Sequence, residues 1–286
     1  MSRERIFIFG MGYTASAFAR ALGDRAEWIR GTTRAGDNGT RRFDGAVADP
    51  LIVGDMAEAT ALVVSVPPGE ADPGLAHFAD AIGAAPQLRW IAYLSTVGVY
   101  GNYAGAWVSE RSTPHPATER ARARLKAERE WTALAARKNV PLATLRLAGI
   151  YGPGRNAFVS LSEGRAHRDV KPGQVFNRIH VDDIAAAMIA ALERHAAGIF
   201  NLADDLPAPP EDVIASAAKI MAVAAPPEVP FDKAELTPMA RSFYAGNARI
   251  VNRKAKAELG LVLRYPTYRE GLAVLWRDGN WKSSRF

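Results

Sequence analysis

The hydrophobic pattern of this chain alternates short apolar runs with longer stretches in which apolar residues recur at helical spacing. The short runs, which contain β-branched and aromatic residues and predict buried strands, are residues 5–9, 27–32, 61–66, 88–94, 142–147 and 199–202. The stretches that predict helices are residues 13–22, 75–85, 119–138, 158–164 and 184–195. Alternation this regular predicts an α/β fold with a doubly wound parallel sheet.

Three regions depart from this regularity. Residues 35–60 predict one weak strand, at either 43–47 or 51–53, and the pattern does not decide between the two. The Pro- and Gly-containing segment that follows residue 101 predicts an exposed loop through residue 116. Beyond residue 148 turn-forming residues become frequent, although sheet elements return around residues 178–203. We therefore expect a main domain over residues 1–150 and a smaller lobe mainly over residues 151–286.

A glycine turn with the sequence GMGYTA joins the first strand to the first helix. Gly10 allows the chain to turn tightly, and Gly12 leaves room for a pyrophosphate to approach the backbone. Ala15 keeps the helix close to the sheet, as a third glycine would. The turn therefore predicts a dinucleotide-binding βαβ unit of the Rossmann type, with a purely structural turn as the alternative.

The helix that follows this turn would contribute to phosphate binding. Tyr13 and Thr14 open the helix, where backbone N–H groups and the positive end of the helix dipole favour an anion. We accordingly expect the main domain to bind the dinucleotide and the smaller lobe to bind the substrate.

The end of the second strand indicates which dinucleotide binds. Sites for NAD place a carboxylate there to bond the ribose 2′-hydroxyl, whereas an arginine suits the 2′-phosphate of NADP. This strand ends in Thr33 and Arg34 without a carboxylate, and hydroxyl and guanidinium groups suit a phosphate. We predict NADP(H), with NAD(H) as the alternative if Arg34 is only a solvated loop residue.

The third strand ends in a Val-Pro-Pro-Gly loop, which should lie at the same edge of the sheet as the glycine turn. Val66 and Pro67 would then pass along the ribose or the pyrophosphate. The alternative is a rigid turn with no ligand.

Composition narrows the class of protein. The 286 residues are 48% hydrophobic and 23% charged, as in an ordinary soluble globular protein. No apolar run approaches the roughly 20 residues that cross a bilayer, and the first apolar run is too short for a signal peptide. The chain contains 0 cysteines, which excludes disulfides, thiolate metal sites and a cysteine nucleophile. We expect a cytoplasmic protein without a membrane partner.

The net charge of +6 raises the question of nucleic-acid binding. The basic residues are spread along the chain and mixed with acidic ones, which is typical of solvated helix faces. We predict no nucleic-acid partner, because an anionic cofactor or substrate accounts for the excess charge. The segment His180-Val181-Asp182-Asp183 favours capping of a helix over metal binding, and we predict no metal.

Five stretches, in this order, carry a resemblance that covers nearly the whole chain. They are GMGYTA at Gly10, LSTVGVYG at Leu94, RLAGIYGPGR at Arg146, RIHVDDIAAAM at Arg178 and GIFNLADD at Gly198. With them the chain resembles the extended short-chain dehydrogenase/reductase family, which includes sugar-nucleotide epimerases and dehydratases. The resemblance implies a Rossmann fold with a cofactor cleft, in which Ser95 and Ile150 lie beside the cofactor.

The family's mechanism uses a Ser or Thr, a Tyr and a Lys four residues after the Tyr. By resemblance Thr96 matches the Ser/Thr and Lys126 matches the Lys, which also contacts the cofactor. The Tyr position is then held by Arg122, and residues 119–131 contain no tyrosine. A guanidinium stays charged and cannot act as the proton shuttle. This loss, together with the short glycine motif, resembles the atypical branch of the family.

Other side chains could supply the missing proton. Candidates are Tyr100, Tyr103, Tyr151, His115 and His180. Each also has an ordinary structural role: shaping of the cleft for the tyrosines of the matched motifs, helix capping for His180 and an exposed loop for His115.

Two functions remain open at this point. The first is an NADP-dependent oxidoreductase-type or epimerase-like enzyme for a small-molecule substrate, with Thr96 and Lys126 retained. An anionic group of that substrate would relieve the repulsion between Arg122 and Lys126. The second is a non-catalytic dinucleotide-binding redox sensor or regulatory protein. Either could form a homodimer.

Overall fold

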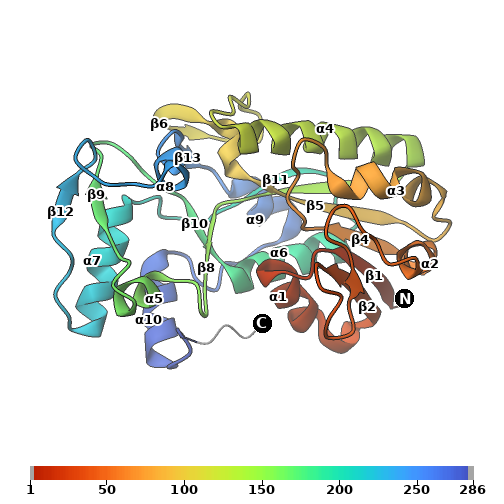
Figure 1. The fold of residues 1–286 in the computed structure, drawn as a ribbon, viewed down its shortest axis with the longest axis horizontal. Helices are drawn as coiled ribbons and strands as arrows, with labels where there is room; N and C mark the ends of the chain where they lie inside the picture. The colour runs from red at the N-terminus through yellow and green to blue at the C-terminus, as the bar shows by residue number, and fades with distance from the viewer. Residues whose placement is uncertain (1–2, 283–286) are drawn as a thin grey trace.

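The computed structural model describes residues 3–282, which form a seven-stranded sheet with a smaller lobe at one end (Figure 1). The strand order is β11-β7-β5-β4-β1-β2-β3, and every neighbouring pair is parallel. The strands are β1 (Glu4–Phe9), β2 (Ala26–Thr33), β3 (Arg41–Arg42), β4 (Ala61–Val64), β5 (Trp90–Thr96), β7 (Leu142–Leu147) and β11 (Gly198–Leu202). The predicted doubly wound α/β fold is confirmed, with its change of direction between β1 and β4.

Helices cover both faces of this sheet because alternate residues of its strands point to opposite sides. Ile6 and Ile8 of β1 pack in one cluster with α1 (Tyr13–Leu22) and α6 (Val181–Glu193). Phe7 and Phe9 pack in the other cluster. The helices of that second face are α2 (Leu51–Glu58), α3 (Pro73–Ala84) and α4 (Glu119–Lys138).

The uncertain region before β4 contains a helix and only a two-residue strand. Residues 51–53 open α2, so the alternative of a strand there is wrong. Ile52 and Met56 are buried four residues apart, which is the spacing of a helix face. Phe43 makes only an isolated bridge to Ala48, next to β3.

The predicted loop after Tyr100 is also more ordered than expected. After a short 3-10 turn, η2 (Val97–Tyr100), the chain forms β6 (Asn102–Val108). This strand pairs in parallel with β13 (Asn247–Ile250), which comes from the far end of the chain. A partner so remote in sequence leaves no local signal for the strand.

The smaller lobe lies at the left of Figure 1 and has its own apolar cluster, which includes Phe158, Ala217 and Leu272. Its strands pair two by two: β8 (Gly149–Tyr151) with β10 (Arg178–His180), and β9 (Arg168–Val170) with β12 (Glu228–Pro230). Its helices are α5 (Ala157–Ser162), α7 (Pro210–Met221), α8 (Pro238–Phe243) and α10 (Tyr268–Arg277). α9 (Arg253–Leu259) packs back onto the main sheet, as α6 does. The remaining short element, η1 (Gly23–Arg25), follows α1.

Within residues 3–282, no helix is both long enough and apolar enough to span a bilayer.

Candidate functional site

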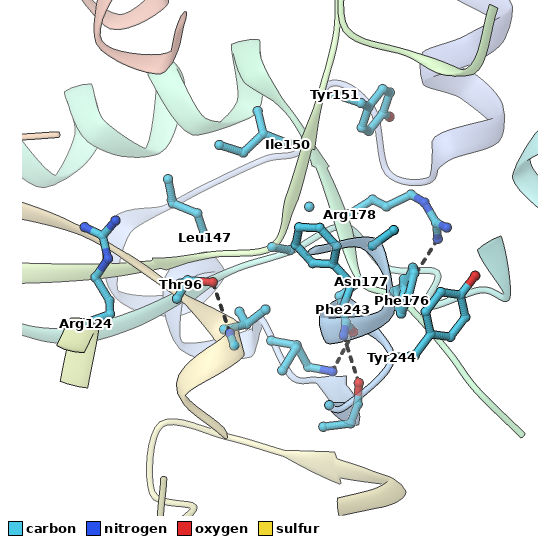
Figure 2. Close-up of a pocket in the computed structure, with 18 of the residues that line it drawn as sticks. Thr96, Arg124, Leu147, Ile150, Tyr151, Phe176, Asn177, Arg178, Phe243 and Tyr244 are labelled. Atoms are coloured by element: carbon cyan, nitrogen blue, oxygen red, sulfur yellow. Dashed lines mark hydrogen bonds between the residues drawn. The ribbon is translucent and has the colours of Figure 1, made fainter. Parts of the chain in front are cut away.

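A cavity of about 1030 Å³ lies between the carboxyl ends of the central strands and the smaller lobe (Figure 2). On the sheet side it is lined by residues 12–14 after β1, residues 94–98 at the end of β5 and residues 147–151 after β7. Arg124 of α4 completes this wall. Phe176, Asn177 and Arg178, together with residues of α8 and β13, form the wall contributed by the lobe.

The glycine turn has the geometry that a nucleotide site needs. Gly10 has φ +89°, and a Cβ there would lie 2.9 Å from Val66 Cγ1, so a side chain is excluded. Gly12 lines the cavity, and a Cβ placed on it would meet no atom within 4 Å. No side chain caps the N-terminus of α1, whereas Ala15 is fully buried against the sheet. The open approach at Gly12 and the uncapped helix end fit a pyrophosphate.

Tyr13 connects this turn to the loop after β8. Its hydroxyl donates a hydrogen bond to the Pro153 carbonyl oxygen (3.0 Å), and burial raises the pKa of the phenol. A Cβ on Gly152 would lie 2.6 Å from that hydroxyl oxygen, so this loop needs a glycine there. Arg155 lies with its guanidinium carbon 5.8 Å from the centre of the Tyr13 ring, which places a cation beside the turn.

The residues at the end of β2 lie outside the cavity lining. The Thr33 hydroxyl donates to Asp37 Oδ1 (2.9 Å) and accepts from the Gly36 N–H (2.9 Å), so the loop itself uses this group. Arg34 is exposed, with no hydrogen-bond or ion-pair partner among residues 3–282. The Asp37 carboxylate therefore lies at the end of β2, although β2 itself ends without a carboxylate.

The loop after β4 contributes only Ser65 to the cavity lining. Val66 packs beside Gly10, and its N–H donates to the Phe9 carbonyl oxygen (3.2 Å). Pro67 is likewise not part of the lining. The structure thus places Val66 against the glycine turn and leaves Pro67 exposed.

At the end of β5, Thr96 and Ser95 have different surroundings. Thr96 lines the cavity half-exposed, and its Oγ1 accepts the Gly98 N–H (3.1 Å), which leaves the hydroxyl proton free to donate (Figure 2). The Ser95 hydroxyl is buried and donates to a Glu128 carboxylate oxygen. That carboxylate forms two hydrogen bonds with Arg146, at 3.1 and 2.7 Å. Ser95 therefore belongs to a buried polar network beneath the site.

The structure does not bring Arg122 or Lys126 to the cavity. Both are exposed, and Lys126 Nζ donates to the Glu70 carbonyl oxygen (3.3 Å) and lies 3.8 Å from Glu130. The face of α4 that meets the sheet carries buried Ala121, Ala127 and Trp131. On a helix of 3.6 residues per turn, positions 122 and 126 point away from that face.

Arg120 and Arg124 occupy the side of α4 that faces the cavity and the lobe. Arg124 Nη1 donates to the Leu94 carbonyl oxygen (2.8 Å) and to the Tyr93 hydroxyl (3.3 Å), which fixes its guanidinium at the end of β5. Arg120 Nη2 donates to Ser242 Oγ (3.0 Å) of the lobe. Arg120 and Arg124 are four residues apart, the spacing expected for Tyr and Lys, and they lie on the opposite side of α4 from Arg122 and Lys126.

The alternative proton donors have structural partners. The Tyr100 hydroxyl donates to Asn201 Oδ1 (2.8 Å), the Tyr103 hydroxyl to the Thr113 carbonyl oxygen (2.5 Å) and the Tyr151 hydroxyl to the Thr267 carbonyl oxygen (3.5 Å). Burial raises the pKa of Tyr100 and of Tyr151, so both phenols stay protonated.

Neither candidate histidine lines the cavity. His180 caps α6, because its Nδ1 accepts the Asp182 N–H (3.1 Å), and burial lowers its pKa to about 4. His115 is exposed, with its ring 5.6 Å from that of Tyr103. Ile150 does line the cavity. Over the described part of the chain, no three His, Asp or Glu residues are grouped as a metal site requires.

Comparison with known proteins identifies relatives along nearly the whole chain. A model of the NAD dependent epimerase/dehydratase family matches residues 75–203. A solved structure of a functionally unknown conserved protein from Silicibacter pomeroyi DSS is 44% identical, covering 97% of this chain and 99% of that one, with a TM-score of 0.88. Protein YeeZ of Escherichia coli strain K12 is 27% identical over 221 residues, which are 70% of this chain and 77% of YeeZ.

Two structures of lower identity share the fold. The human epimerase family protein SDR39U1, solved with NADPH, is 17% identical and has a TM-score of 0.74, with 96% of this chain and 99% of that one covered. MoeE5, solved with UDP-glucuronic acid and NAD, is 19% identical and has a TM-score of 0.75, with the same shares covered. At these identities the comparison concerns the fold alone.

Proposed function

Because the chain belongs to the NAD dependent epimerase/dehydratase family, we propose that it is an oxidoreductase-type enzyme that uses NADP(H) in preference to NAD(H). Its substrate would be a small molecule held between the sheet and the smaller lobe. The observation that carries this proposal is the continuity of the cavity, since Gly12, Thr96 and Phe243 line one space. Its volume of about 1030 Å³ is at the upper end of the range for ligand pockets, roughly 300–1,000 Å³.

The residues beside the glycine turn are suited to the cofactor's phosphates. Gly12 leaves the approach open, the uncapped start of α1 offers N–H donors, and Arg155 adds a positive charge. At the end of β2, exposed Arg34 suits a 2′-phosphate, whereas Asp37 favours a ribose hydroxyl. The NADP(H) preference thus depends on whether Arg34 outweighs Asp37.

The bound nicotinamide would supply or accept a hydride next to Thr96. The Thr96 hydroxyl, whose oxygen already accepts the Gly98 N–H, would donate to a substrate oxygen and orient it. Neither Arg120 nor Arg124 can transfer a proton, because a guanidinium stays protonated. We therefore propose that α4 provides charge and no general acid, and that the family's catalytic tyrosine is absent.

The same two arginines favour a second candidate function, a dinucleotide-binding protein that does not catalyse hydride transfer. A double variant, Arg120→Tyr with Arg124→Lys, introduces the Y-x-x-x-K spacing on the side of α4 that carries Arg124. Gain of NADPH oxidation with a panel of aldehydes, ketones and sugar nucleotides would indicate an otherwise competent site. If the wild type and the double variant both bind NADPH but neither oxidises it with the panel, the result would support the non-catalytic dinucleotide-binding function.

The cofactor assignment is tested by fluorescence titration with NADPH and NADH. For wild-type protein we expect tighter binding of NADPH. Arg34→Ala should weaken NADPH binding by about tenfold and leave NADH unchanged, because a charge-assisted hydrogen bond contributes about 1.5–3 kcal/mol. Arg129→Ala, which removes an exposed charge on α4, is the matched control. Equal losses for both cofactors in Arg34→Ala would contradict the 2′-phosphate assignment.

A further inference from the structure

The cavity has an unbalanced charge. Its lining includes three arginines, Arg124, Arg155 and Arg178, against a single carboxylate, that of Asp169. A dinucleotide is itself anionic, so part of this positive charge belongs to the cofactor under the function proposed above. The positions of the three arginines show which of them is available to bind a substrate.

Two of the three arginines already have a role. Arg155 lies over the Tyr13 ring, beside the glycine turn, where the cofactor's phosphates would lie. Arg178 Nη1 donates to the carbonyl oxygens of Phe176 and Ala208, both at 3.0 Å, and the Asp204 carboxylate acts on its charge. Neither is placed to bind a substrate group at Thr96, since Arg155 lies beside the glycine turn and Figure 2 shows Arg178 on the lobe side, away from Thr96.

Arg124 differs in its position, because it lies on the cavity wall that carries Thr96. Nη1 donates to Leu94 and Tyr93, whereas Nε and Nη2 have no hydrogen-bond partner among the residues that the structure describes. Of the nearby carboxylates, Glu128 is paired with Arg146, and Asp72 caps α3 through the Leu75 N–H (3.1 Å) while its charge interacts with that of Arg124. No carboxylate of residues 3–282 lies within 4 Å of the Arg124 guanidinium nitrogens.

The direction of Arg124 makes these donors available to a ligand. Figure 2 shows the guanidinium on the same side of the cavity as Thr96 and Leu147, opposite Phe243 and Tyr244 of the lobe. Its contact with the Leu94 carbonyl holds the planar group in place, which lowers the entropy lost when it binds. The Thr96 hydroxyl adds a further donor on the same wall.

We infer that Arg124 is the substrate-binding residue for an oxyanion and that the substrate carries a carboxylate, held by the Nε/Nη2 edge of Arg124 in front of Thr96. A planar carboxylate matches the two parallel N–H donors of a guanidinium edge. This inference rests on the proposed function for its site. It makes a separate claim about the substrate, because the groups proposed above for the cofactor's phosphates, Gly12, the start of α1 and Arg155, do not include Arg124.

The test uses full-length protein saturated with NADP+ and compares four variants for binding of acetate, benzoate and inorganic phosphate by calorimetry. Benzamide, which has the shape of benzoate without its charge, is the neutral control. Arg124→Gln removes the guanidinium, Arg124→Lys keeps the charge without the fork, and Thr96→Val removes the added donor. Arg122→Gln makes the same chemical change as Arg124→Gln on the exposed face of α4.

We expect wild type and Arg122→Gln to bind benzoate more tightly than phosphate or benzamide. Arg124→Gln should bind benzoate at least about tenfold more weakly than wild type does. Arg124→Lys and Thr96→Val should have affinities between those two. NADP+ affinity should stay unchanged in Arg124→Gln, Arg124→Lys and Arg122→Gln, and all four variants should remain folded.

Three results would overturn the inference. The first is equal benzoate binding by wild type and Arg124→Gln, and the second is no binding of any of these anions to wild type. The third is loss of NADP+ affinity in Arg124→Gln with anion binding retained, which would make Arg124 a cofactor residue. Failure of wild type to bind NADP+ would instead contradict the proposed function.

Discussion

The buried pair Glu128–Arg146 beneath the site should be essential for stability, and Glu128→Ala tests this. The two side chains are only 6% and 3% exposed, and their charged groups meet at 2.7 and 3.1 Å. Removing the carboxylate leaves Arg146 buried without a counter-charge and Ser95 without its acceptor. Breaking a buried pair in this way costs about 3–5 kcal/mol, a large part of the usual 5–15 kcal/mol of a folded protein.

Chemical unfolding in urea, followed by circular dichroism, measures this loss. Glu130→Ala is the matched control, because Glu130 is two residues away on the same helix and makes only a partly exposed contact with Lys126 at 3.8 Å. That control should change the free energy of unfolding by at most about 0.5 kcal/mol. Replacing both partners, with Glu128→Leu and Arg146→Met, should recover most of the loss, since no charge remains buried alone. A loss below about 1 kcal/mol in Glu128→Ala would refute the reasoning.

Two further predictions concern the turn and the pH dependence. Gly10→Ala should destabilise the protein by about 1–3 kcal/mol and lower its melting temperature, because the residue has φ +89° and a Cβ would approach Val66; an unchanged melting temperature would contradict the observed turn. Burial raises the pKa of Asp204 to about 7, against an ordinary value of 3.8. Between about pH 4 and pH 7 the folded carboxyl therefore keeps a proton that the unfolded one releases, so its contribution to stability is lost as pH rises through that window. Asp204→Asn should remove this loss of stability. If the free energies of unfolding of wild type and variant change in parallel from pH 4 to pH 7, Asp204 does not titrate as described.

The elements that could be predicted are those whose signal is local. The bounds of α1, α4 and β7 follow from apolar spacing and capping residues, and the glycine turn follows from Gly10 and Gly12. The pairing of β6 with β13 could not be predicted, because their partners are more than 100 residues apart in the sequence. The contact of Tyr13 with Pro153 is non-local in the same way.

The candidate site could be predicted from the sequence only in part, for a different reason. The sequence predicts Arg122 and Lys126 from the spacing of the family's motif. Residues 119–131 contain no tyrosine that would fix which residues occupy the motif's positions. The buried stripe of Ala121, Ala127 and Trp131 shows that Arg122 and Lys126 point away from the sheet, whereas Arg124 lies on the sheet side of α4. The position of the Arg124 guanidinium depends on a hydrogen bond to the Leu94 carbonyl oxygen, and such a bond leaves no pattern in the sequence.

The open space at Gly12 should receive a nicotinamide dinucleotide, and a binding titration tests this. Fluorescence titration with NADPH and with NADH compares wild type with Gly12→Val, whose added Cβ meets no protein atom within 4 Å and whose side chain would occupy the approach to α1. We expect saturable binding of NADPH to the wild type and an affinity at least about a hundredfold lower in Gly12→Val, at an unchanged melting temperature. Wild-type protein that binds neither cofactor, or a Gly12→Val variant that binds them as wild type does, would contradict it.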